Sequence, residues 1–204
     1  MTGRVRPNRS PPRVASLRSR GLDAARKLLE EGGPEALHLR AIAGEIGCGV
    51  ASLYYHFAHK DALLAALAIE GFRELQVRME KAMESGRYPR RIDAASAAYL
   101  RFMHANLPLY ALMHSERTLQ GSEAVRAAEQ GAFASFRRSL EGDARVPAER
   151  LDDIALTCWA LGRGIAATIL ASGETDPAAA RALAEKVLRG FNFLQRHASS
   201  RARS

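Results

Sequence analysis

The stretch that decides the fold is LRAIAGEIGCGVASLYYHFAHKDALL, residues 39–64. Its first part places apolar residues at i, i+3, i+4 and i+7, the spacing of one helix face. These residues are Leu39, Ile42, Ala43 and Ile46. Gly47 follows them, and glycine lets a chain leave a helix through a positive φ. The pattern predicts a short helix that ends at this glycine.

A second short helix is predicted directly after the turn. The same apolar spacing recurs in Val50, Leu53, Tyr54 and Phe57. A helix, a turn with glycine and a second helix are typical of a helix-turn-helix, whose second helix enters the major groove of DNA. With Leu53 and Phe57 inward, the outward face is small, polar and aromatic. It holds Ala51, Ser52 and Tyr55, which suit groove contact better than plain solvation.

Composition bounds the class of protein. The chain has 204 residues, 47% of them hydrophobic, which is enough for a substantial core in one large or two small domains. No uninterrupted run of about 18 apolar residues occurs, so no membrane span is predicted. The N-terminal arginines have no apolar run behind them, so no secretory signal is predicted. Cys48 and Cys158 lie far apart without metal-like spacing, which favours a reducing cytoplasm.

The net charge of +8 is unevenly spread. Residues 1–60 contain ten Lys and Arg against five Asp and Glu, whereas residues 61–204 contain twenty against seventeen. The excess therefore lies around the helix-turn-helix, as expected of a surface that meets phosphates. Charge alone would equally describe a solvated basic tail. Beside the motif, DNA contact is the favoured interpretation.

The motif resembles the DNA-binding domain of the TetR family of bacterial transcriptional regulators. The resemblance covers roughly residues 14–64 and lies in Ile42-Ala43, Gly47, Leu53-Tyr54-Tyr55-His56-Phe57, Lys60-Asp61 and Leu63-Leu64. It implies that backbone phosphates are gripped by Tyr54, His56 and Lys60. It also implies that base edges or flanking phosphates are reached by Arg40, Val50, Ala51, Ser52 and Tyr55.

Three capping positions depart from the family's pattern. His38, Gly49 and His59 stand where Ser or Thr is common. Ser or Thr at a helix N-cap is worth about 1 kcal/mol over a non-capping residue, and glycine is nearly as good. We expect weakened caps in an unchanged fold.

Helical periodicity continues along the chain, and no strand pattern rises above noise. Helices are predicted over 14–31, 61–85, 92–106, 122–140, 151–172 and 177–195, so the fold class is all-α. By the resemblance, the helix over 61–85 links the DNA reader to the remaining domain. The last two helices are long and apolar, and we expect them to form the interface of a homodimer that binds two half-sites.

The first thirteen residues carry four arginines, three prolines and no acid, which predicts disorder. Such an arm either enters a minor groove or is an inert tail. The expected organisation is a basic arm, a DNA-binding domain, a ligand-binding and dimerisation domain and a disordered tail, over residues 1–13, 14–60, 61–197 and 198–204.

Nothing in the sequence indicates an enzyme. None of the six histidines stands four residues from another His or Cys with an acid nearby, and no G-x-S-x-G or phosphate-cradling loop occurs. We therefore predict no catalytic residue, no metal site and no cofactor. Cys48, in the turn of the motif, is either an oxidant sensor or a small buried residue.

A ligand pocket is predicted in the second domain. The segments 99–115 and 159–164 resemble a C-terminal subgroup of the same family, which has Trp, three residues and His-Gly. Arg163 stands here in place of that His. Pockets are mostly apolar with a few polar anchors, although aromatic and Met side chains at helical spacing are more often plain core. The candidates are Tyr99, Phe102, Met103, Tyr110, Met113, Phe133, Phe136, Trp159 and Arg163.

Arg163 falls on the inner side of an apolar helix, where a charge is costly unless it is paired. Three environments would satisfy it. It pairs with an acid such as Glu116 or Glu129, it faces solvent, or it meets an anionic ligand.

The predicted function is a ligand-responsive regulator of transcription. We expect a homodimeric repressor on double-stranded operator DNA, released by a small and largely apolar effector. The alternative is an architectural DNA binder without an effector. A third interpretation, an enzyme that uses the helix-turn-helix as a protein contact, lacks a catalytic constellation.

Overall fold

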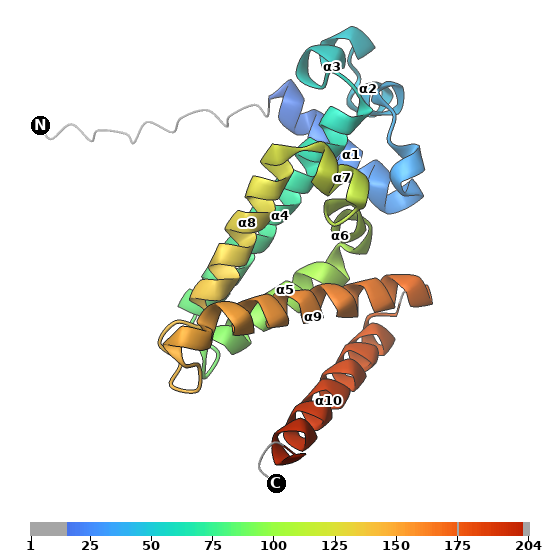
Figure 1. The fold of residues 1–204 in the computed structure, drawn as a ribbon. Coiled ribbons are helices and arrows are strands. Elements are labelled where there is room, and N and C mark those ends of the chain that lie inside the picture. The colour runs from blue at the N-terminus through green and yellow to red at the C-terminus, as the bar shows by residue number, and fades with distance from the viewer. Residues whose placement is uncertain (1–15, 175, 202–204) are drawn as a thin grey trace, which may run out of the picture.

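The computed structural model describes residues 16–174 and 176–201, and all regular elements in these ranges are helices (Figure 1). Two short 3₁₀ helices, Pro34–Ala36 and Ala148–Arg150, precede α2 and α9. The α-helices are α1 (Leu17–Gly32), α2 (Leu39–Ile46), α3 (Val50–His56), α4 (Lys60–Glu84), α5 (Arg91–Ala105), α6 (Leu107–Met113), α7 (Glu116–Gly121), α8 (Glu123–Arg138), α9 (Leu151–Ser172) and α10 (Pro177–Arg201).

The all-α prediction is confirmed, with differences at element ends. The basic arm 1–13 lies outside the described residues, as do residues 202–204 of the expected tail. α10 continues to Arg201, so residues 198–201 are helical. α7 was not predicted, because six residues are too few to show a helical period. Its start is marked by Ser115, whose hydroxyl accepts a hydrogen bond from the N–H of Thr118.

The helix-turn-helix forms as its sequence predicts. Gly47 ends α2 with φ 65° and ψ 44°, the left-handed conformation, and its N–H points back to carbonyls of the last turn. α1 packs on α2 and α3. Between them Leu22, Leu29, Leu53 and Phe57 are buried. This small core fixes the angle at which α3 projects from the domain.

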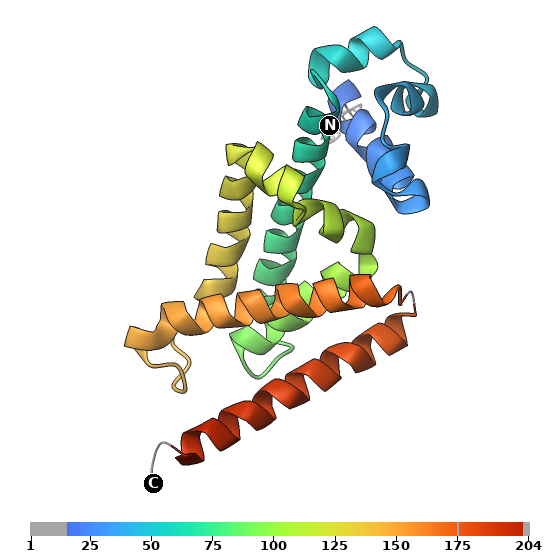
Figure 2. The same ribbon diagram turned by 45° about the vertical axis from the view of Figure 1, so that its right-hand side comes forward.

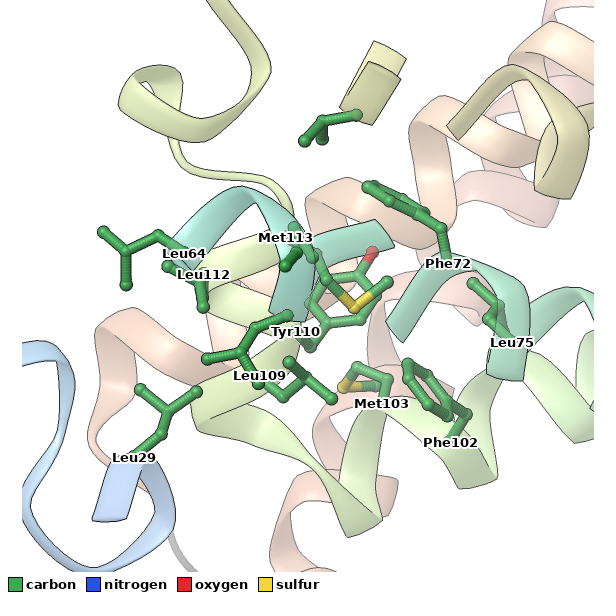
Figure 3. Packing of buried hydrophobic residues seen from close by; sticks show 14 of the residues in the cluster. Leu29, Leu64, Phe72, Leu75, Phe102, Met103, Leu109, Tyr110, Leu112 and Met113 are labelled. Carbon is green, nitrogen blue, oxygen red and sulfur yellow. The ribbon is translucent and has the colours of Figure 1, made fainter. Parts of the chain in front are cut away.

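α4 is the central helix of the molecule. It runs from the helix-turn-helix to the far end of the second domain and packs against α8, α5, α6 and α1 (Figure 1). Its buried residues belong to one hydrophobic cluster that also contains residues of α1, α5 and α6, several of which Figure 3 shows gathered together. The buried face of α4 comprises Leu63, Leu64, Ala66, Leu67, Ala68, Gly71, Phe72, Leu75 and Met79.

α9 and α10 lie outside the α4–α8 layer. In both ribbon views α9 crosses the lower end of that layer, and α10 lies beyond it (Figures 1 and 2). The segment Ala148–Ser172 is long and apolar enough to cross a membrane by length and composition, yet only 28% of its apolar window is buried. Trp159, Ile165 and Ile169 face the core, while Leu156 and Leu170 are exposed. Within the described residues, part of the apolar surface of α9 is thus left exposed.

The capping expectation is correct at two of three positions. His38 and Gly49 make no side-chain cap. At α4, however, Nδ1 of His59 accepts a hydrogen bond from the N–H of Ala62 at 3.2 Å. The imidazole therefore caps the helix as a Ser hydroxyl would, and the weakening that we expected at this cap does not occur.

The two glycines of α2 and its turn have opposite conformational needs. Gly47 has a positive φ, whereas Gly44 lies inside the helix with open space around it. Gly47→Ala should destabilise the protein by about 1–2 kcal/mol, because an L side chain is strained in the left-handed region. Gly44→Ala should stabilise it by roughly 0.5–1 kcal/mol, because alanine loses less entropy in a helix.

The measurement is the free energy of unfolding from urea titrations of both variants and the parent. Gly44→Ala is the matched control, because it adds the same methyl group three residues away. Shifts of the same sign in both variants would contradict the assignment of the turn.

Candidate DNA-binding interface and ligand cavity

The outward face of α3 is strongly exposed. Tyr55 is 88% exposed and Tyr54 is 55% exposed, whereas Leu53 is 0% exposed. Ala51 and Ser52 are also exposed. Leu53 and Phe57 are buried as predicted, whereas Tyr54, which belongs to the same apolar set, is exposed.

The other predicted DNA contacts surround this face. Val50, His56 and Lys60 are half-buried at the ends of α3 and the start of α4, and Arg40 is exposed on α2. Among the described residues, neither Arg40 nor Lys60 makes an ion pair. Both charges are therefore available to DNA without first breaking an ion pair among the described residues.

Contacts that the sequence did not predict hold α2 against α1. Nη2 of Arg20 donates to the carbonyl of Ile46 at the C-terminal end of α2, at 2.5 Å. Nζ of Lys27 lies 2.6 Å from Oε1 of Glu45. A cation beside the last carbonyls of a helix is favourable because of the helix dipole. The only feature of the sequence that could have predicted these contacts is the seven-residue spacing of Arg20 and Lys27, which places both cations on one face of α1.

A second polar cluster joins α1 to α4 and α6. Nη1 of Arg26 lies 2.7 Å from Oε2 of Glu74, and its Nη2 donates to Oδ1 of Asn106. Arg78 donates from Nε and Nη2 to Oε1 of Glu74, at 2.8 Å and 2.5 Å. Burial raises the pKa of Glu74, but the hydrogen bonds from both arginines outweigh it, and the net pKa is lowered. Glu74 is therefore a carboxylate shared by two guanidinium groups.

An apolar cavity of about 140 Å³ lies between α5, α8, α9 and α10. Trp159 forms one wall, with ring centroids of Tyr99 at 5.3 Å and Phe136 at 5.7 Å. Phe133 packs on the same indole at 5.6 Å. Burial raises the pKa of the Cys158 thiol, which keeps it neutral. The lining residues are Ser96, Tyr99, Leu100, Phe136, Cys158, Trp159, Leu161, Gly162, Ile165 and Leu188.

A second hollow of about 400 Å³ lies between α6 and α9, where Tyr110, His114 and Arg163 are among the lining residues. Nη1 of Arg163 lies 3.2 Å from Oε1 of Glu129, the first of the environments predicted for it. The hydroxyls of Tyr110 and Tyr99 share a hydrogen bond. Burial raises the pKa of Tyr110 to about 12 and lowers that of His114 to about 4, so both are neutral at pH 7.

The structure separates the predicted pocket residues into groups. Tyr99, Phe136 and Trp159 line the apolar cavity, and Tyr110 and Arg163 line the second hollow. Phe133 packs on Trp159 and lines neither space. Phe102, Met103 and Met113 are fully buried and also line neither space. Lining residues that were not among the predicted pocket candidates include Ser96, Leu100, Cys158, Leu188 and His114, because apolar spacing cannot tell a cavity wall from a packed core.

These elements define a helix-turn-helix DNA-binding regulator with a separate helical domain. The family description "Bacterial regulatory proteins, tetR family" matches residues 22–67, and "Tetracyclin repressor-like, C-terminal domain" matches residues 92–191. The chain belongs to the TetR family. It is a DNA-binding transcriptional regulator and not an enzyme.

Solved structures agree with this assignment. A protein of unknown function from Rhodococcus sp. RHA1 is 31% identical, with a TM-score of 0.66 over 88% of this chain and 97% of that chain. The TetR family transcriptional regulator PfmR from Thermus thermophilus is 23% identical, with a TM-score of 0.54 over 83% and 97%. A TetR transcriptional regulator from Legionella pneumophila is 17% identical, with a TM-score of 0.60 over 88% and 99%. The last two show the fold alone. No curated protein matches the chain.

Proposed function

We propose that the protein is a cytoplasmic, homodimeric repressor that leaves its operator when a small apolar molecule fills the cavity beside Trp159. The observation that carries this proposal is the cavity itself, about 140 Å³ and almost wholly apolar. Its walls belong to the same hydrophobic cluster as the buried face of α4. The alternative, an architectural DNA binder without an effector, gives this cavity no role.

The proposed DNA contacts follow the exposed surface of α2, α3 and the start of α4. Tyr54, His56 and Lys60 grip phosphates, because they lie at the edge of the reader and carry hydrogen-bond donors. The residues nearer the groove read base edges or flanking phosphates, and these are Arg40, Val50, Ala51, Ser52 and Tyr55.

Two charge-removing variants separate these roles. Lys60→Ala should weaken binding to all DNA sequences alike and lower the slope of log affinity against log salt by about one. Arg40→Ala should relax preference at one base pair, at a cost of roughly 1–3 kcal/mol there. A binding selection followed by salt titrations measures both. Unchanged base preferences in Arg40→Ala and Ser52→Ala would refute the assignment of these two residues.

A homodimer through α9 and α10 is supported by the open face of α9. Leu156 is 61% exposed and Leu170 is 37% exposed, and the exposed positions between them are mostly small. Small residues permit close approach of helices, and a two-fold pair of helix hairpins forms a four-helix bundle. Leu183 of α10 is less suitable as an interface probe, because it packs against the core of its own chain.

Leu156→Glu should therefore convert the dimer to a monomer, because a charge would be buried in the interface without a partner. Val77→Glu is the matched control, because Val77 is 45% exposed on α4, away from the proposed interface. Sedimentation velocity measures the oligomeric state of both. A dimeric Leu156→Glu would place the interface elsewhere.

The size of the cavity limits its occupant. An apolar cavity of roughly 150 Å³ in another protein holds benzene, so a molecule of about that size fits here. Such a molecule changes DNA binding only if it binds one arrangement of the two readers better than the other. The path is short, because Tyr99 and Phe136 come from α5 and α8, which pack directly on α4.

Trp159 is the single tryptophan of the chain and reports on the cavity directly. We expect toluene and cyclohexane to change its fluorescence saturably, with weaker affinity when a selected operator sequence is present. Operator affinity should then fall by the same factor when the compound is present, because the coupling is reciprocal.

Ser96→Leu should abolish the change in Trp159 fluorescence, because the leucine side chain would fill the cavity. Ala105→Leu, at the exposed end of α5, should leave the change in fluorescence intact. Equal compound affinities with and without operator would refute release by an effector in this cavity and leave the architectural alternative.

A further inference from the structure

A basic hollow of about 490 Å³ lies at the end of α4 that is far from the DNA reader. It is formed by the last turns of α4, the connection to α5 and the middle of α5. Four cationic residues and one aromatic residue dominate its lining, and no carboxylate takes part in it. These five residues are Arg78, Lys81, Arg87, Tyr88 and Arg101.

Most of these charges are uncompensated. Among the described residues, Lys81 and Arg87 make no ion pair, and Nη1 of Arg101 donates to the Tyr88 hydroxyl at 2.7 Å. The guanidinium of Arg101 also lies 6.0 Å from the centre of the Tyr88 ring. Two acids close by in the sequence bind elsewhere: Glu80 pairs with Arg138 at 2.7 Å, and Asp93 pairs with Arg90 at 2.5 Å. A third, Glu84, is exposed and does not line the hollow.

Operator DNA does not explain this cluster. α4 is one continuous helix, and its 1.5 Å rise per residue puts Lys81 about 30 Å from Lys60 along the axis. Figure 1 shows the two ends of α4 at opposite sides of the second domain. A duplex on α3 therefore leaves this hollow free. Like charges that gather around one hollow repel one another, and a bound anion relieves that repulsion.

We propose that this hollow binds a small molecule carrying a diphosphate group. Arginine presents a planar fork of donors that matches phosphate oxygens, and charge-assisted hydrogen bonds of this kind are the strong ones. Lys81, Arg87 and Arg101 supply three charges with no acid to displace, which suits a ligand with two or more negative charges. Tyr88 holds Arg101 in place and forms an apolar wall beside it.

The site is connected to the DNA reader through Arg78. This arginine lines the hollow and donates to Oε1 of Glu74, while Oε2 of Glu74 binds Arg26 of α1. A diphosphate that draws Arg78 away changes the partner set of Glu74 and hence the contact between α4 and α1. This consequence, a change in operator affinity, rests on the proposed function, whereas the binding itself does not.

The primary experiment is a calorimetric titration of the full chain, without DNA, with sodium pyrophosphate at constant ionic strength. We expect one saturable site per chain. Arg87→Gln and Arg101→Gln should each weaken it at least tenfold. Two controls should stay within twofold: Arg73→Gln, an exposed arginine of α4 outside the hollow, and Lys60→Ala in the reader.

Absence of a saturable site would overturn the proposal. Losses of pyrophosphate affinity in Arg73→Gln or Lys60→Ala equal to those in Arg87→Gln and Arg101→Gln would also overturn it, because they would show a general attraction of the anion to a basic protein. Citrate binding as tightly as pyrophosphate would overturn the phosphate assignment. ADP separates the sources of the group: tighter binding than pyrophosphate supports an organic diphosphate, and equal binding supports the free inorganic anion.

The connection is tested with Glu74→Gln and a selected operator. Pyrophosphate should alter operator affinity in the parent and have no effect in Glu74→Gln, although the variant still binds pyrophosphate within threefold. An unchanged response in Glu74→Gln would refute the path through Glu74. If the parent protein failed to bind the operator even without pyrophosphate, the proposed function would be refuted. The calorimetric result would still stand, because it is measured without DNA.

Discussion

Burial of one face of α4 is the constraint on which the rest of the structure depends. This face continues from Leu63 beside the helix-turn-helix to Met79 in the second domain, and α1, α5, α6 and α8 all pack on it. Each large apolar side chain that is fully buried contributes about 1.5–3 kcal/mol, so the face outweighs any single polar contact. Close packing also leaves little freedom along it. A Cβ at Gly71 would lie 2.5 Å from the sulfur of Met113, so a larger residue there would force the Met113 side chain to move. Close-packed interiors transmit strain, and α4 packs both on α1 of the DNA-binding part and on α5, α6 and α8 of the second domain.

The polar contacts at the edge of this core have a different role. Arg26, Glu74 and Arg78 are all partly exposed, and exposed ion pairs are worth roughly 0–1 kcal/mol. They add little to stability, although Arg26 and Glu74 join α1 directly to α4. α9 meets two environments, since Trp159 lines the cavity whereas Leu156, one turn earlier, is open to solvent. The cavity wall and this exposed surface therefore belong to the same helix.

The sequence by itself determined the local features of this protein. Apolar residues at i, i+3, i+4 and i+7 predicted the helices, and Gly47 predicted the turn, because both depend on backbone geometry within a few residues. The exposed side chains of Ser52 and Tyr55 follow from the same periodicity once Leu53 is buried. The family resemblance extended these predictions to named contacts with DNA.

Only the tertiary structure decided which side chains share an environment. Phe102 and Phe136 have the same helical spacing in the sequence, yet one is core and the other is a cavity wall, because the difference lies in what α9 and α10 place opposite them. The sequence offered Glu116 and Glu129 as acids for Arg163, and the packing of α8 on α9 makes Glu129 the partner. The basic hollow likewise exists only because the turn between α4 and α5 brings Lys81 and Arg101 to the same hollow, and such distances are not encoded in local periodicity.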